Sequence, residues 1–165
     1  MSRPDLPLLI GVLREPVYSP GRFFDADRAI LRETARACET AGARVRILPA
    51  DAPRQAFAGA RLVFTMCQGP ESLETMGWLA ASGVTVVHEP SAIQSCHRTR
   101  MLPLLARAGL PRPEALLIEC ADPTPEALAW AEAGGELGVW VKRGDVHATQ
   151  PQDVAHLRGE AAVRG

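Results

Sequence analysis

The sequence contains no asparagine and a single lysine, Lys142, among its 165 residues. The other 17 of its 18 basic residues are arginines, and 19 acidic residues bring the formal net charge to -1. A chain with this balance has no overall positive field to attract nucleic acid or an anionic membrane surface. We therefore expect neither nucleic acid nor a membrane among its partners.

Long apolar runs are also missing. The first run, Leu8 to Leu13, is shorter than the core of a signal peptide and has no small-residue cleavage site after it. No segment approaches the roughly 20 apolar residues that span a bilayer. The cytoplasm is therefore the expected location. Hydrophobic residues make up 47% of the chain, as in an ordinary globular protein that buries its core without help from disulfides or metals.

Four cysteines are spread along the chain without a CxxC pair: Cys38, Cys67, Cys96 and Cys120. This spacing argues against a zinc site and a disulfide framework, and their apolar neighbours predict buried free thiols. Cys67 has a second interpretation as a nucleophile, because it follows a predicted strand and precedes Gln68-Gly69. A buried thiol remains the preferred prediction for it, and no metal site is predicted anywhere in the chain.

Several motifs with known chemistry are absent. The sequence has no GxGxxG, GxxxxGK[ST], HExxH or GxSxG pattern. The sequence therefore lacks the residues that define a dinucleotide-binding glycine fingerprint, a P-loop, a zinc protease or a serine hydrolase.

Short apolar runs alternate with helix-length segments in the first half of the chain. Strands are predicted over residues 8–13, 45–48, 62–66 and 84–88, and a helix is predicted over 71–81. Another helix, capped by Asp25 or Asp27 and ending near Gly42, is predicted with one apolar stripe of Ile30, Leu31, Thr34, Ala37 and Cys38. Continuous runs of Val, Ile and Leu are typical of strands covered on both faces, and the alternation predicts parallel pairing. We therefore predict an α/β fold with a Rossmann-like parallel sheet. Ligands of such sheets gather at the carboxyl ends of the strands, here the loops 14–24, 66–71 and 88–91.

The pattern changes near residue 90, where we place a domain boundary between residues 1–90 and 91–165. The second part reads as a small α+β subdomain. Its predicted helices cover 92–96, 100–108, 124–133 and 151–157, and its predicted strands cover 114–120 and 137–142.

An ordered set of short motifs runs from residue 84 to residue 143. His88-Glu89-Pro90-Ser91-Ala92-Ile93 is followed by His97-Arg98-Thr99-Arg100, then by Gly109-Leu110-Pro111-Arg112-Pro113, and finally by an apolar strand that ends in Lys142-Arg143. This order and spacing resemble the ATP-grasp superfamily. Residues 8–87 are similar to the Rossmann-like domain that commonly precedes the grasp domain, of which this chain would contain only the first lobe.

The resemblance implies a role for each cation of this segment. Lys142 would hold the α- and β-phosphates of ATP, and Arg98 or Arg100 would stand in the place of the family's earlier phosphate-binding lysine. The loop after Lys142 has one glycine where the family has a glycine-rich lid, so side chains such as Arg143 or His147 would cover the phosphates. The alternative for each of these residues is a solvated position on a strand end or helix face.

Two functions follow from these observations. The resemblance implies the amino-terminal portion of an ATP-dependent ligase that joins a carboxylate to an amine or thiol through an acyl phosphate. ATP and magnesium would be its cofactors, with the magnesium ligands in the second lobe of the grasp domain. No catalytic residue is assigned in this chain, which alone is expected to be inactive. The alternative is a non-catalytic Rossmann-like module that binds a small anionic ligand or a partner chain. Both hypotheses leave the oligomeric state open, a homodimer included.

Overall fold

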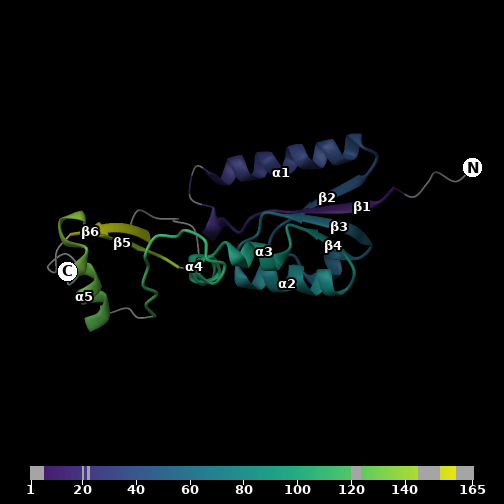
Figure 1. Ribbon diagram of the computed structural model, residues 1–165. Coiled ribbons are helices and arrows are strands. Elements are labelled where there is room, and N and C mark those ends of the chain that lie inside the picture. The colour runs from purple at the N-terminus through teal and green to yellow at the C-terminus, as the bar shows by residue number, and fades with distance from the viewer. Residues whose placement is uncertain (1–5, 20, 22, 120–123, 145–152, 159–165) are drawn as a thin grey trace, which may run out of the picture. The chain divides into compact units, whose positions relative to one another are not determined.

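The structure is a computed structural model that describes residues 6–19, 21, 23–119, 124–144 and 153–158. The chain divides into two compact units, Met1–Gln94 and Ser95–Gly165. Figure 1 shows the elements of both units along the chain. No helix among the described residues is long and apolar enough to cross a membrane.

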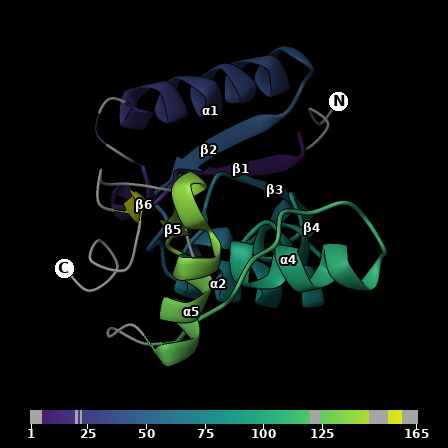
Figure 2. The same cartoon turned by 60° about the vertical axis from the view of Figure 1, so that its left-hand side comes forward.

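The first unit is a parallel sheet with helices on its two faces. Its strands are β1 (Leu8–Val12), β2 (Arg44–Leu48), β3 (Ala60–Thr65) and β4 (Thr85–Val87), in the order β2-β1-β3-β4. Every neighbouring pair is parallel. The sheet lies between α1 (Phe23–Thr40) and α2 (Pro70–Ala81), as both views show (Figures 1 and 2). The predicted α/β fold with a Rossmann-like parallel sheet is confirmed.

Each face of the sheet has its own apolar cluster. On the α2 side, Ile10, Val12, Val63 and Met76 are fully buried. On the α1 side, the ring of Phe64 packs across Gly11, where an added Cβ atom would lie 2.7 Å from the ring. Only glycine leaves room for the ring there. The resulting close packing of β1 against β3 fixes the two strand ends that carry the candidate site.

Helix α1 differs from its prediction in two respects. It begins at Phe23, so Asp25 lies in its first turn and Asp27 lies inside the helix, where neither residue is a cap. The predicted apolar stripe included Ile30, yet that side chain is 58% exposed, and Leu31 and Ala35 form the buried face. A start two residues earlier leaves Asp27 available for contacts with the loop after β1.

The short helix α3 (Pro90–Ser95) contains the boundary between the two units. The second unit then contains α4 (Arg98–Arg107), α5 (Pro125–Ala133) and the antiparallel hairpin of β5 (Val139–Lys142) and β6 (Val154–Leu157). Thr124 caps α5, because its hydroxyl accepts the backbone N–H of Ala127 at 3.1 Å. Three short 3-10 helices complete the described elements: η1 (Pro16–Tyr18), η2 (Arg54–Phe57) and η3 (Gly135–Leu137).

Three predictions from the sequence are wrong. Residues 114–119 form no strand, since no other described segment pairs with their backbone. Residues 154–157, predicted as helix, form β6, because their backbone pairs with β5 from Val139 to Lys142. The described cysteines are free thiols, but only Cys67 is buried, whereas Cys38 is half-buried and Cys96 is exposed. Cys120 lies outside the described residues.

Candidate functional site

Two loops meet at the carboxyl ends of β1 and β3. Strand β1 pairs with β2 along one edge and with β3 along its other edge. Strand order therefore reverses between β1 and β3, and this reversal is where open parallel sheets bind their ligands. The loops that begin at residues 14 and 66 were both predicted as ligand-binding segments.

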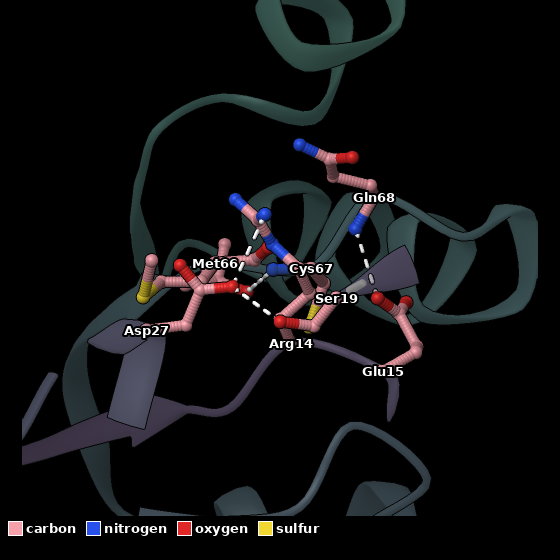
Figure 3. Close-up of polar contacts among 8 residues, drawn as sticks. Arg14, Glu15, Ser19, Asp27, Met66, Cys67 and Gln68 are labelled. Atoms are coloured by element: carbon pink, nitrogen blue, oxygen red, sulfur yellow. Dashed lines mark hydrogen bonds and ion pairs between the residues drawn. The ribbon is translucent and has the colours of Figure 1, made fainter. Parts of the chain in front are cut away.

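Arg14 joins the first loop to the second. Its Nε donates a hydrogen bond to the carbonyl oxygen of Met66 at 3.2 Å, and its Nη1 lies 3.2 Å from Oδ2 of Asp27 (Figure 3). The Ser19 hydroxyl donates to the same Asp27 oxygen at 2.6 Å. The Arg14 and Asp27 side chains are only 21% and 14% exposed, so their attraction is less screened than that of a surface pair.

Glu15 supplies a second link between the loops. Its carboxylate accepts the backbone N–H of Gln68 at 3.1 Å (Figure 3) and that of Gly69 at 2.9 Å. Gly69 is the residue before α2, so the negative charge lies at the positive end of that helix dipole. A Cβ atom at position 69 would lie 2.6 Å from the ring of Tyr18 and 2.8 Å from the Glu15 carboxylate, which explains why a glycine occupies it.

Cys67 is buried next to these contacts. The side chain is 1% exposed, and its Sγ–H donates to the carbonyl oxygen of Leu13 at 3.3 Å. Burial, with a smaller contribution from the nearby Glu15 carboxylate, raises the pKa of the Cys67 thiol from 9.0 to about 11. Since the thiolate is the reactive form, a thiol with this pKa is a packing residue. The nucleophile hypothesis for Cys67 is therefore not supported.

This cluster was largely missed by sequence reasoning. The sequence predicts that the loops 14–24 and 66–71 bind a ligand, but it does not single out Glu15, Ser19 or Asp27 as site residues. The available signal was the position of Arg14-Glu15 directly after an apolar strand. In the structure the cationic, anionic and backbone amide groups of this cluster are bonded to one another, and the Gln68 side-chain amide points away from Glu15 (Figure 3).

Asp27→Asn is expected to lower the free energy of unfolding by about 1 to 2 kcal/mol, because the partly buried Arg14 guanidinium loses its charged partner. An asparagine oxygen can still accept from Ser19, which limits the loss. Urea denaturation followed by circular dichroism measures the change. Asp51→Asn, at an exposed residue, is the matched control and should fall within about 0.5 kcal/mol of wild type. Equal stability of all three proteins would show that the Arg14–Asp27 pair contributes nothing.

In the second unit, the first turn of α4 is hydrogen-bonded to the end of β5. Nη1 of Arg98 donates to the carbonyl oxygen of Arg143 at 2.8 Å. The backbone N–H of Thr99 donates to the carbonyl oxygen of Gly144 at 3.2 Å. Two basic segments 45 residues apart in the chain are thereby brought together. Lys142, the last residue of β5, is exposed, and its Nζ lies 5.7 Å from the centre of the Trp140 ring.

The sequence also predicts Arg100, Arg143 and His147 as phosphate-binding residues. Arg100 is exposed in α4, two residues after Arg98. Arg143 lies beside Asp153, with Nη1 and Oδ1 3.7 Å apart. His147 lies outside the described residues.

The described residues do not fit a magnesium site. Among them, no group of three or more His, Cys, Asp or Glu side chains lies close enough to hold a metal ion. The carboxylate beside the cations, that of Asp153, is buried and faces Arg143. Magnesium prefers an octahedral set of exposed oxygens, so no role for it is derived from these residues.

Comparison with models of known protein families finds no match to this chain, and a search of curated proteins finds none either.

Proposed function

We propose that the chain is the amino-terminal portion of an ATP-dependent ligase of the ATP-grasp type, and that Lys142, Arg98 and Arg143 bind the phosphates of ATP. In such a reaction the γ-phosphoryl group passes from ATP to a carboxylate. The resulting acyl phosphate is attacked by an amine or a thiol, which releases inorganic phosphate. The observation that supports the proposal is the pair of hydrogen bonds between α4 and the end of β5.

Those bonds matter because they hold cations from two motifs at one place. Arg98 has one donor on the main-chain carbonyl of Arg143, which restrains its guanidinium beside the backbone at the end of β5. Arginine can bridge two phosphate oxygens with its fork of N–H groups, whereas lysine supplies a compact point charge. A triphosphate, with several negative charges close together, fits such a mixed cluster better than a single carboxylate would.

A second candidate function is binding of a small polar ligand by the first unit alone, without catalysis. The contacts among Arg14, Asp27 and Glu15 at the β1/β3 strand ends favour it, because they build a polar cluster at the position where parallel sheets bind ligands. This candidate needs no nucleotide and no further lobe.

One titration separates the two candidates. In 15N-labelled protein, ATP added through the millimolar range should shift the backbone amides of residues 98–99 and 142–144 saturably. Inorganic tripolyphosphate should compete, and AMP should compete poorly, because the cations face the phosphate chain. Shifts confined to residues 14–19 and 66–69 would support the second candidate. Absence of any saturable shift would refute nucleotide binding by this chain.

A further inference from the structure

Asp153 is a buried carboxylate attached to the proposed phosphate-binding segment at two points. Its side chain is 7% exposed, and its Oδ1 lies 3.7 Å from Nη1 of Arg143. Its main-chain carbonyl accepts the backbone N–H of Arg143 at 3.1 Å. Together with the bond from Arg98 to the Arg143 carbonyl, these contacts restrain both the backbone and the side chain of Arg143.

The hairpin geometry explains why the two residues face each other. Lys142 pairs with Val154 at the end of the antiparallel register, so Arg143 and Asp153 continue the same ladder by one residue. Directly opposed side chains of an antiparallel pair have Cβ atoms about 4.5 to 5.5 Å apart. The Arg143 side chain is 46% exposed, so one end of the pair is buried while the guanidinium reaches water.

We infer that Asp153 is a positioning residue that holds the Arg143 guanidinium in the orientation that meets a phosphate of ATP. The inference rests on the proposed function. A long arginine side chain loses considerable rotamer freedom on binding a ligand, and a buried carboxylate at its base removes part of that freedom beforehand. A buried carboxylate costs desolvation energy that pairing offsets, so contact between the Asp153 carboxylate and the Arg143 guanidinium is favoured.

A merely structural role for Asp153 makes a different prediction. If Asp153 only stabilises the hairpin, its replacement changes nucleotide affinity by the same factor whether or not residue 143 is an arginine. If it orients Arg143, its effect requires that arginine. A double-mutant cycle measures this dependence directly.

The experiment measures ATP affinity by isothermal titration calorimetry for wild type, Asp153→Asn, Arg143→Met and the double variant. Asp153→Asn should weaken ATP binding about tenfold in the wild-type background and leave it unchanged in the Arg143→Met background, within the range of coupling between contacting residues. Asp51→Asn, an exposed aspartate, is the matched control and should leave the affinity unchanged. If Asp153→Asn loses the near-ultraviolet circular dichroism of the folded protein, Asp153→Glu replaces it, with a smaller loss expected that again depends on Arg143.

The outcomes separate this inference from the proposed function. Equal weakening by Asp153→Asn in both backgrounds, or no weakening, overturns the positioning role while Lys142→Met can still show that the phosphates bind here. If neither Lys142→Met nor Asp153→Asn changes ATP affinity, the proposed function is wrong and the positioning role falls with it.

Discussion

Lys142→Met is expected to weaken ATP binding by roughly 10- to 150-fold and to leave the melting temperature unchanged. A hydrogen bond to a charged group contributes about 1.5 to 3 kcal/mol, and each 1.4 kcal/mol is a factor of ten in affinity. Lys142 is exposed at the end of β5, and exposed charges add little to folding stability. Calorimetric titration with ATP and thermal denaturation of the same samples measure the two quantities.

Two further variants identify the cause of the loss. Lys142→Arg keeps the charge and exchanges a compact ammonium for a planar guanidinium, so an affinity between those of wild type and Lys142→Met is expected. Arg107→Met removes one positive charge from the last turn of α4 and should bind ATP as wild type does. Equal affinities of wild type and Lys142→Met would refute the phosphate assignment. An equal loss in Arg107→Met would show a general charge effect in place of a site.

The parallel sheet was predictable because its evidence is local. Strands β1, β3 and β4 are mostly apolar, and β2 has Val45, Ile47 and Leu48 beside two arginines. The segments between the first and second and between the third and fourth strands are long enough for a helix. Such runs are covered on both faces only in a layered parallel sheet. The strand order was not predictable, since pairing of β1 with both β2 and β3 depends on contacts distant in sequence, such as Phe64 over Gly11.

The errors lie where a segment's conformation depends on a partner. Residues 114–119 have a strand-like composition, but a strand exists only when another backbone accepts its hydrogen bonds, and the described residues supply none. Residues 154–157 are too few to show a period, and pairing with β5 decides their conformation. The same dependence hid Asp153 as a site residue, because only the hairpin places it opposite Arg143.

The candidate sites were predictable to different extents. The cations of the second unit were found from motif order, and the structure brings Arg98 to Arg143. At the β1/β3 strand ends, sequence reasoning located both loops but not the residues that join them. The sequence predicts Asp25 or Asp27 as the cap of α1, but the helix begins at Phe23, which leaves Asp27 inside the helix and in contact with Arg14. Helix ends are the least certain part of any such prediction.

Stability at alkaline pH should depend strongly on Cys67. Burial raises the pKa of this thiol to about 11 in the folded protein, against 9.0 for an exposed thiol. The folded state therefore keeps a proton that the unfolded chain releases. The resulting stabilisation is fully present below pH 9.0 and is lost as the pH rises to about 11. Two pH units at 1.4 kcal/mol each correspond to a loss of about 2 to 3 kcal/mol in the free energy of unfolding.

Cys67→Ala isolates this contribution. The variant is expected to be less stable at pH 8, because it leaves a small cavity among buried side chains. Its free energy of unfolding should then fall less steeply than that of wild type between pH 9.0 and about 11, so the two curves converge. Urea denaturation at a series of pH values gives both curves, and parallel curves would mean that the thiol ionises as readily in the folded protein as in the unfolded chain. That result would restore Cys67 as a candidate nucleophile, since reactivity requires a thiolate at accessible pH.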